Sequence, residues 1–551
     1  MKTPQIPRTS LWTRLILPVL LALIGFAQSA RAQSFVHPGL LHTQADFDRM
    51  TAQVNANAQP WKAGWDRLVA NSHSQSTWNP NPQATIIRGG DGQNYGILYN
   101  DIHAAYQNAL RWKISGVAAH GDKARDILNA WSATHTTLTG NADRYLAAGI
   151  YGYQFANAAE IMRGYPGFDV ARFQSYLLNV YYYPLTERFL WGNSFGSDHN
   201  GACITNYWAN WDQCNLAAAI AIAIFCDDRP KFDRAIQYFK TGAGNGAVGK
   251  AVPFLHGANL GQWQEAGRDQ GHSTLGAGLA AAFCEMAWNQ GQDMYGWDSS
   301  RIRKGMEYVA QYNRGQSVPF TTYNWGSGTN CSPMSHTVVS SSGRGNDRPV
   351  WGIISGHYKG RLGQTSTIAS IEAYYAQLGT EGGGGDYGST SGGYDQLGFG
   401  GLCFTRTGTA TQPVATGTYS LRNRASGKML DNLGATADGA TVAQWADGSS
   451  NNQRWVLSYT GNYAKLQCVT GGKYLDSLGH TGNDTTVGQW ANGGSNNQQW
   501  TIQDLGTGYF KIINRANGLC LDTGGATADG AVMEFWGSGG SNNQQWQFVA
   551  P

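Results

Sequence analysis

The sequence predicts a mainly α first domain, in which helix pairs close into a ring, an (α/α) toroid, followed by an all-β second domain with threefold internal repetition. Two observations support this fold class. Apolar residues recur at helical spacing in alanine-rich segments between residues 35 and 405. A polar motif ending in tryptophan then recurs three times, at spacings of 45 and 46 residues, in the last 135 residues.

The first domain begins with the capping-box pattern Thr43-x-x-Asp46 before Phe47 and Met50, which predicts the start of a helix. Beyond Thr321 the content of Ser, Thr, Gly and Val rises, and we expect irregular or β segments there. The glycine-rich stretch 379–401 should form ordered loops that close the domain. Helical periodicity, interrupted by Gly, Pro and Asn turns, predicts helices over 123–133, 145–162, 207–225, 231–239, 275–288 and 302–312.

In the second domain, three copies of Ser-Asn-Asn-Gln-x-Trp stand at 450–455, 495–500 and 541–546. Each copy also has a Leu-Asp pair and, about 14 residues after the Asp, a second tryptophan. Short strand-like runs and glycine turns lie between these landmarks. Because such units are too small to bury a core alone, we expect them to close against one another.

Residues 1–32 have the three parts of a secretory signal peptide: a basic start, the apolar run 15–26 and the small-residue site Ala30-Arg31-Ala32. We therefore expect a mature chain that starts at Gln33 and is secreted or periplasmic. The polar stretch 409–416 is typical of a linker. The predicted organisation is a signal peptide (1–32), a toroid domain (33–408), a linker (409–416) and a β domain (417–551).

Composition and charge exclude several classes of protein. Of the 551 residues, 41% are apolar and 14% are charged, which rules out a disordered chain, collagen or a coiled coil. The formal charge is +3, but the first 32 residues carry four basic side chains and no acid, so the rest has a charge of −1. A polybasic nucleic-acid binder is thereby excluded. The apolar run 216–225 has ten residues, too few to span a bilayer, so no membrane anchor is predicted.

The sequence gives no reason to expect a metal or a cofactor. It has no CxxC pair and no HExxH motif among its eight cysteines and twelve histidines. Residues 244–249 match GxGxxG, but they follow a predicted helix rather than a strand, which argues against a dinucleotide site. In an exported protein, an even number of widely spaced cysteines predicts buried thiols or one or two disulfides.

Polar and aromatic residues gather in two segments, 197–211 and 262–272. Each segment precedes or opens an alanine-rich helix. In a helical toroid such positions lie at the mouth of the ring, so the two segments could face each other across one cleft. They contain the candidates for catalysis.

The three tryptophan motifs resemble those of the ricin-type β-trefoil lectins, the group of carbohydrate-binding module family 13. The resemblance covers about residues 417–551 and implies one shallow sugar site per repeat, while the Gln-x-Trp residues are mainly structural. In each site an Asp accepts hydrogen bonds from hydroxyls, an aromatic ring packs on a pyranose, and an Asn completes the set. These residues are Asp431, Trp445 and Asn452; Asp476, Trp490 and Asn497; Asp522, Trp536 and Asn543. How many of the sites bind sugar stays open.

The first domain is similar to the alginate lyase superfamily of polysaccharide lyases. The segments 37–42, 206–212 and 265–272 carry the resemblance, which continues through Glu307-Tyr308 and Arg348-Pro349. It covers about residues 35–405 and is greatest to polysaccharide lyase family 38, whose members cleave alginate or β-glucuronan. The resemblance implies a lyase for an anionic uronate polysaccharide, with glycan bound by the second domain.

The reaction of such a lyase is β-elimination, which needs the sugar carboxylate neutralised before a base removes the proton on C5. We predict His272 as base or carboxylate partner, Arg268 as the cation and Asn206 as neutraliser. Tyr207 or Tyr308 would be the proton-transferring phenol. His199 is a further candidate because related lyases use an adjacent Asn-His pair, although the order is reversed here. Which residue is base and which is acid stays open. Candidates for substrate binding are Gln270, Glu265, Trp263 and Trp211.

Two other functions remain possible at this stage. A glycoside hydrolase on a helical toroid would need two carboxylates about 5–10 Å apart. Glu265 and Asp269 are candidates, but a spacing of four places them on one face of a helix. The third reading is a glycan-binding protein without catalytic activity. In each case we expect a monomer.

Overall fold

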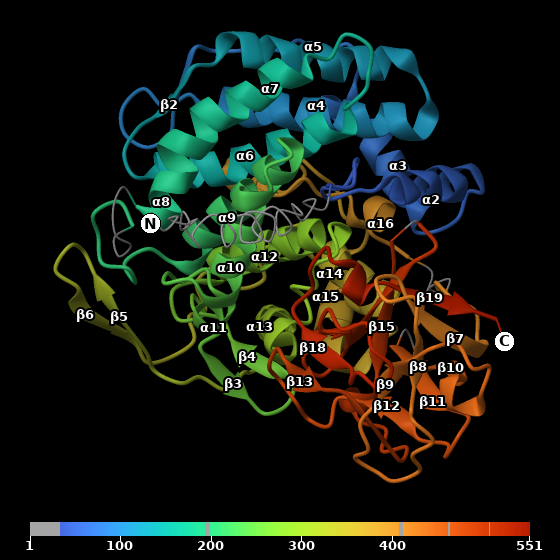
Figure 1. Ribbon diagram of the computed structural model, residues 1–551. Helices are drawn as coiled ribbons and strands as arrows, with labels where there is room; N and C mark the ends of the chain where they lie inside the picture. Colours follow the sequence, from blue (N-terminus) through green and yellow to red (C-terminus); the bar gives the residue numbers. More distant parts are fainter. Residues whose placement is uncertain (1–33, 193–198, 407–411, 461–462, 506, 551) are drawn as a thin grey trace, which may run out of the picture.

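The computed structural model describes residues 34–192, 199–406, 412–460, 463–505 and 507–550. Figure 1 shows a helix-rich N-terminal part and an all-β C-terminal part, coloured from blue to yellow and from orange to red. The predicted change from helices to strands is thereby confirmed. The predicted signal peptide and residues 409–411 of the predicted linker lie outside the described residues.

The helices of the N-terminal part agree with the sequence pattern, with each predicted segment inside or overlapping an observed helix. Thr43 caps the first of them, with the predicted reciprocal bonds to Asp46. The longer helices are α2 (Gln44–Asn55), α3 (Trp61–Ala70), α4 (Tyr95–Ser115), α5 (Ala118–Thr134), α6 (Asp143–Ile161), α9 (Ala209–Phe225), α10 (Arg229–Thr241), α12 (Gln270–Asn289), α13 (Trp297–Asn313) and α15 (Ala369–Leu378).

Shorter elements connect these helices. Two pairs of three-residue strands and one longer hairpin lie among them, and the hairpin confirms the β character expected after Thr321. The short elements are β1 (Thr85–Ile87), β2 (Thr137–Thr139), α7 (Val170–Tyr176), the π-helical η2 (Leu177–Thr186), α8 (Glu187–Trp191), α11 (Val248–Ala251), β3 (Phe254–His256), β4 (Leu260–Gln262), β5 (Tyr323–Ser327), β6 (Ser332–His336), α14 (Trp351–Ser355), the π-helical η3 (Gly356–Arg361) and α16 (Gly400–Cys403).

The buried layer of the N-terminal part consists of four helices that pack in chain order: α4 on α6, α6 on α9, and α9 on α12. Almost every residue of α6, α9 and α12 is buried, which is the pattern of helices covered on all sides. The more polar helices α5, α10 and α13 pack on the outside of this layer. Small residues make the close packing possible, since a Cβ on Gly149 of α6 would overlap the Cys214 sulfur of α9.

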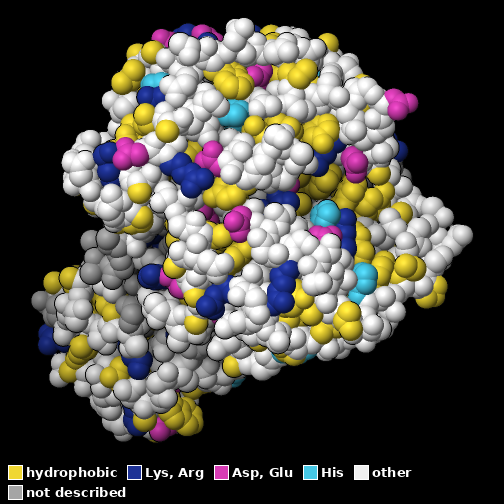
Figure 2. Space-filling model, turned by 180° about the vertical axis from the view of Figure 1, so that it is seen from behind, with side chains coloured by type: hydrophobic (Ala, Val, Ile, Leu, Met, Phe, Trp, Pro, Cys, Tyr) yellow, Lys and Arg dark blue, Asp and Glu magenta, His cyan; other side chains and the backbone are white. Residues whose placement is uncertain are grey.

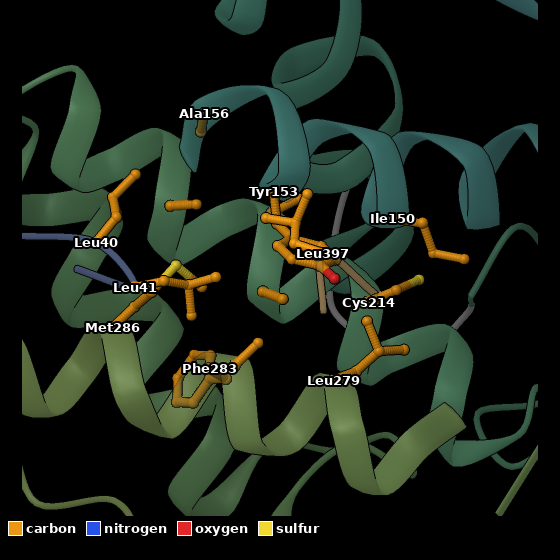
Figure 3. Packing of buried hydrophobic residues seen from close by; sticks show 14 of the residues in the cluster. Leu40, Leu41, Ile150, Tyr153, Ala156, Cys214, Leu279, Phe283, Met286 and Leu397 are labelled. Atoms are coloured by element: carbon orange, nitrogen blue, oxygen red, sulfur yellow. The ribbon is translucent and has the colours of Figure 1, made fainter. Parts of the chain in front are cut away.

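Figure 3 shows the core between these helices. Tyr153 of α6, Cys214 of α9 and Phe283 of α12 converge there. Leu41, from the segment before α2, and Leu397, from the glycine-rich stretch, also enter the same core. The two ends of the N-terminal part are therefore built into one core. The stretch 379–401 is ordered within the described residues, as expected.

A buried group of charges also joins the ends of this part. Arg361 of η3 and Arg406 both bind Glu285 of α12, at 2.6 and 3.2 Å, and Arg406 also binds Asp46 of α2 at 2.9 Å. Burial alone would raise the pKa of Glu285, but the charges of the two arginines lower it overall. Because such charges are costly to bury unless they are paired, these helices are held in one arrangement.

The strands of the C-terminal part form one network of thirteen, in which the chain repeats the same path three times. We refer to the repeats as the first lobe (417–460), the second lobe (463–505) and the third lobe (507–550). The strands are β7 (Gly417–Asn423), β8 (Met429–Asp431), β9 (Ala443–Trp445), β10 (Trp455–Thr460), β11 (Tyr463–Cys468), β12 (Tyr474–Asp476), β13 (Thr485–Thr486), β14 (Gly488–Trp490), β15 (Trp500–Asp504), β16 (Phe510–Asn514), β17 (Cys520–Asp522), β18 (Glu534–Trp536) and β19 (Trp546–Val549).

The tryptophan that ends each repeated motif is structural, as predicted. Trp455, Trp500 and Trp546 are fully buried in the common core of the lobes. Their indole nitrogens donate to the carbonyls of Leu430, Leu475 and Leu521 at 3.0, 3.1 and 3.0 Å. One tryptophan from each lobe thus ties its last strand to the Leu-Asp strand.

The Gly244–Gly249 segment follows α10 and runs into the start of α11, so a helix precedes it and not a strand, as the sequence analysis concluded. Among the described residues, no helix has the length and apolar character needed to cross a membrane.

The pH dependence of stability follows from three buried histidines. Burial lowers the pKa of His42 to about 4, of His103 to about 3 and of His135 to about 4. Above pH 6.5 these histidines are neutral in both the folded and unfolded states. As the pH falls below 6.5, the unfolded chain takes up protons that the folded protein does not, so stability falls toward pH 4.

We expect the midpoint of thermal unfolding to be lower at pH 4.5 than at pH 7.5, by on the order of 5–10 °C. Calorimetry or circular dichroism over this range measures the shift. Between pH 7 and 8 these three histidines contribute no change in the midpoint. Burial raises the pKa of Glu381 to about 7, which opposes the trend, so the comparison is made in the Glu381→Gln variant. A constant midpoint of that variant down to pH 4.5 would show that these histidines are not held neutral.

Candidate functional site

The two polar segments of the sequence lie side by side in the structure. The backbone nitrogens of Ala209 and Asn210, at the start of α9, donate to the side chains of Gln264 and Glu265, each at 3.0 Å. The Asn210 amide also donates to Glu265 at 2.6 Å. The Arg268 guanidinium lies 5.2 Å from the centre of the Trp208 ring. The two segments are therefore in direct contact, whereas the sequence analysis expected them to face each other across a cleft.

Four charged or titratable side chains are clustered around the start of α12. Arg268 Nη1 donates to Glu265 at 2.9 Å, and Arg268 Nε lies 3.5 Å from Asp269. Asp269 caps the helix, accepting from the His272 backbone nitrogen at 2.8 Å and contacting His272 Nδ1 at 2.7 Å. Arg268 Nη2 lies 3.2 Å from His272 Nε2. Arg268 and His272, which the sequence predicted as a pair, are therefore in direct contact.

The two carboxylates of this cluster differ in their environment. Glu265 is fully buried, and burial raises its pKa despite the opposing effects of Arg268 and Asn210. Burial would also raise the pKa of Asp269, but its bonds from His272 and the charge of Arg268 lower it overall. Asp269 is thus the anionic partner of His272, while Glu265 fixes the position of Arg268 from the protein interior.

The cluster determines which nitrogen of His272 can take a proton. Because Nδ1 faces the Asp269 carboxylate, Nδ1 carries the hydrogen of the neutral ring, and the electron pair of Nε2 accepts a hydrogen bond from Arg268 Nη2. The His272 side chain is 39% exposed and the Arg268 side chain 25%. A proton-accepting nitrogen and a guanidinium are therefore both within reach of a ligand.

The β5–β6 hairpin covers the same region and is attached to it covalently. A disulfide joins Cys203, before α9, to Cys331 in the hairpin turn. The Asn206 side-chain oxygen accepts from the Gly328 backbone nitrogen at 2.6 Å and from Ser327 Oγ at 3.4 Å. Asn206 thus holds the hairpin through its oxygen, and only its amide nitrogen could serve a ligand.

The hairpin brings aromatic side chains to the cluster that the sequence analysis missed. Tyr323 and His336 are direct strand partners, so they share one face of the hairpin with Trp325. The His336 ring stacks on Trp208 with centroids 5.7 Å apart and lies 4.7 Å from Trp325. Burial, together with the charge of Arg268, lowers the pKa of His336. Its isolated position in a Ser-rich segment gave no sequence pattern that could have revealed it.

Two surface features accompany this site. An open depression of about 610 Å³ lies along the hairpin and is lined in part by Ile204, Trp325 and Met334. Figure 2 shows a hollow lined by hydrophobic side chains below the upper helices, with histidine, basic and acidic side chains near its edge. This face of the molecule is therefore recessed, as binding of a ligand would require.

His199 lies in a different environment from the one predicted. It is only 1% exposed, and its Nε2 binds Asp212 of α9 at 2.8 Å and the Tyr238 hydroxyl at 3.2 Å. The backbone nitrogens of Gly244 and Gly246 bind Tyr238 and Asp212 from the other side. A buried ring cannot contact a polymer, so the role of His199 is structural. The glycine-rich loop stabilises the buried group of His199, Asp212 and Tyr238 through its backbone nitrogens.

Three further predicted residues are also buried, so their side chains do not face a ligand. The Tyr308 hydroxyl donates to the Pro319 carbonyl at 2.9 Å, and burial raises its pKa, opposite to what a proton-transferring phenol needs. Trp263 is fully buried and packs against Gly276 and Gly305. The Gln270 amide donates to two backbone carbonyls, and its oxygen accepts from Asn313. These side chains shape the core beneath the site.

Tyr207 and Trp211 are half-buried and lie together, with ring centroids 4.8 Å apart. The Tyr207 hydroxyl accepts a hydrogen bond from the Asn200 amide at 3.1 Å. The hydroxyl hydrogen of Tyr207 is not used in this bond, so it could be donated to a ligand. Of the two predicted phenols, Tyr207 remains the candidate.

The predicted sugar-binding residues occupy matching positions in the three lobes. Trp445, Trp490 and Trp536 are 44%, 46% and 39% exposed, which is unusual for so large a ring. Each predicted Asp accepts from the backbone nitrogen two residues later, at 2.6–2.8 Å. Each lobe therefore presents an exposed indole beside a fixed carboxylate.

Among the residues that the structure describes, no group of three or more His, Cys, Asp or Glu side chains is arranged to hold a metal ion. In the same residues the six cysteines outside the disulfide are free thiols, five of them buried.

Comparisons with known proteins agree with this division. Residues 71–319 match the alginate lyase family. The ranges 407–490, 451–536 and 496–551 match the ricin-type β-trefoil lectin domain-like family. A search of curated proteins gave no significant match.

Three solved structures are similar to about a quarter of the chain. ThreeFoil, a designed threefold-symmetric protein, is 38% identical over 24% of this chain and 99% of its own, with a TM-score of 0.24. The exo-β-1,3-galactanase 1,3Gal43A from Clostridium thermocellum is 35% identical over 25% of this chain and 31% of its own, with a TM-score of 0.24. A Macrolepiota procera ricin B-like lectin in complex with lactose is 23% identical over 25% of this chain and 99% of its own, with a TM-score of 0.23.

The Cys203–Cys331 disulfide closes a loop of 128 residues. We expect its reduction to lower the free energy of unfolding by about 2–4 kcal/mol, because the open chain has more freedom when unfolded. Guanidinium unfolding with and without dithiothreitol measures this difference. The Cys331→Ser variant should have the lower stability in both conditions. Equal stability of the oxidised and reduced wild-type protein would contradict this expectation.

Proposed function

We propose that this chain, which combines an alginate lyase domain with ricin-type β-trefoil lectin-like repeats, is a secreted polysaccharide lyase. Its substrate is an anionic uronate polysaccharide, alginate or β-glucuronan, which it cleaves by β-elimination. The lectin-like repeats attach the enzyme to glycan. In this proposal residues 33–408 form an incomplete (α/α) toroid and residues 417–551 a β-trefoil, joined by the linker 409–416 and preceded by a signal peptide.

The observation that carries the proposal is the contact between Arg268 and His272 on an accessible surface. The family match gives the reaction class, and the cluster supplies the groups that the reaction needs. The guanidinium binds the sugar carboxylate and withdraws its negative charge, which makes the neighbouring C5 proton more acidic. His272 Nε2 lies 3.2 Å from that guanidinium, so a candidate base lies beside the place where the carboxylate would bind.

The elimination then proceeds as follows. His272 Nε2 takes the proton from C5, and the C5–H electrons form the double bond between C4 and C5. The bond between C4 and O4 breaks, and O4 leaves with its electron pair and a proton from the acid. Asp269 stabilises the imidazolium that forms, because it binds Nδ1. We assign Tyr207 as the acid and the Asn206 amide nitrogen as a second donor to the carboxylate.

The alternative of a glycoside hydrolase is less well supported. Its two carboxylates would have to flank a scissile bond, but Glu265 and Asp269 both lie on the same guanidinium. Glu265 is also fully buried, so it could not reach a sugar. A glycan-binding protein without activity would need no accessible base beside a cation.

Incubation with alginate and β-glucuronan tests the reaction class. A lyase produces an unsaturated product that absorbs in the near ultraviolet, whereas a hydrolase produces reducing ends without that absorbance. We expect absorbance with at least one of these polymers. A binder without activity would give neither product.

The His272→Ala variant should lower kcat by at least about a hundredfold, within the range of general-base catalysis. His272 is half-exposed, so its thermal midpoint should stay close to that of the wild type. Arg172→Ala, in an exposed ion pair of α7, is a matched control that should keep full activity. Full activity of His272→Ala would show that His272 is not the base. The reaction class would still be decided by the product assay.

A further inference from the structure

The third lobe differs from the other two at the residue opposite its predicted sugar-binding aspartate. In the strand ladder, Asp431 faces Ala443, and Asp476 faces Gly488. In the third lobe, Asp522 faces Glu534. Directly opposed residues of an antiparallel pair have Cβ atoms about 4.5–5.5 Å apart. The third lobe therefore carries two carboxylates where the other lobes carry one.

A second difference makes room for the added carboxylate. The residue two positions after the aspartate has a positive φ in every lobe, and it is Leu433, Leu478 and Gly524 in turn. A Cβ on Gly524 would overlap the Glu534 carboxylate. The glycine and the glutamate are therefore complementary, and the third lobe has exchanged an apolar side chain for an acidic one.

The acidic group also contacts the exposed aromatic ring of its site. The Trp536 indole nitrogen donates to Glu534 Oε2 at 3.4 Å. Any sugar that packs on Trp536 and bonds to Asp522 must therefore approach both carboxylates. At such short range, like charges repel and hydroxyl or ammonium donors are attracted.

The rest of the third site is intact. Trp536 is exposed, Asp522 is fixed by the Gly524 backbone nitrogen at 2.8 Å, and the Asn543 amide lies against Gly525. A site that had simply been lost would have no reason to keep this set while gaining a fitted acidic group.

We propose that the third lobe binds an uncharged sugar and rejects the uronate polymer, because Glu534 adds a second carboxylate that the first and second lobes lack. Glu534 is the residue that sets this specificity. The inference rests on the proposed sugar-binding role of the lobes. A single protein would thus bind its acidic substrate and a neutral glycan beside it at the same time.

Full-length variants with one working lobe test the proposal, each carrying His272→Ala to prevent turnover. Trp445→Ala with Trp490→Ala leaves the third lobe, and Trp490→Ala with Trp536→Ala leaves the first. The variant that lacks all three rings, Trp445→Ala with Trp490→Ala and Trp536→Ala, measures how much probe binds outside the lobes. The probes are a β-1,4-glucuronate tetramer and the β-1,4-glucose tetramer, which differ only at C6, together with a neutral galactose tetramer. Calorimetric titration at low salt measures the affinities.

We expect the third lobe to bind a neutral tetramer at least tenfold more tightly than the glucuronate tetramer. Glu534→Ala should raise its affinity for glucuronate at least tenfold. The reciprocal change, Leu433→Gly with Ala443→Glu in the protein with only the first lobe, should lower glucuronate affinity by a similar factor.

Equal or tighter binding of glucuronate by the unaltered third lobe would overturn the proposal, as would failure of that lobe to bind any of the probes. These outcomes are separate from the absorbance assay, which tests the lyase reaction whatever the lobes bind.

Discussion

The buried carboxylate of Glu265 is the interaction on which the active region depends. It accepts two hydrogen bonds from Asn210 at the start of α9 and one from Arg268 just before α12. A fully buried carboxylate must be paired, since an unpaired charge in the interior costs several kcal/mol. Two segments separated by more than fifty residues are therefore fixed against each other, and Arg268 is held with its Nη2 directed toward His272.

Support for this arrangement comes from layers that a ligand cannot reach. His199, Asp212 and Tyr238 form a buried group under the start of α9, and the glycine-rich loop binds it through backbone nitrogens. The disulfide and the Asn206 side chain hold the hairpin above it. The lectin-like part uses a different principle, with one buried tryptophan per lobe holding the strands and one exposed tryptophan free to contact ligand.

Burial explains which predicted residues kept their roles. Arg268 precedes the N-cap residue Asp269, and His272 lies in the first turn of α12, so the contacts of Asp269 at this helix start bring the two together. Tyr308, Trp263 and His199 are of the right chemical type, but they face the interior. The sequence could not separate these cases, because α9 and α12 are apolar on all sides and their flanking segments have no periodicity to indicate a face. His336 reaches the site only through the pairing of β5 with β6.

The sequence by itself determined the order of the parts, most helix positions and the threefold repeat, because helical spacing and self-similarity are local properties of a chain. Only the tertiary structure decided which polar side chains reach solvent, that His336 stacks over Trp208, and that the Glu534 carboxylate fills the space above Gly524. These are contacts between residues distant along the chain, and they depend on packing that no short segment specifies.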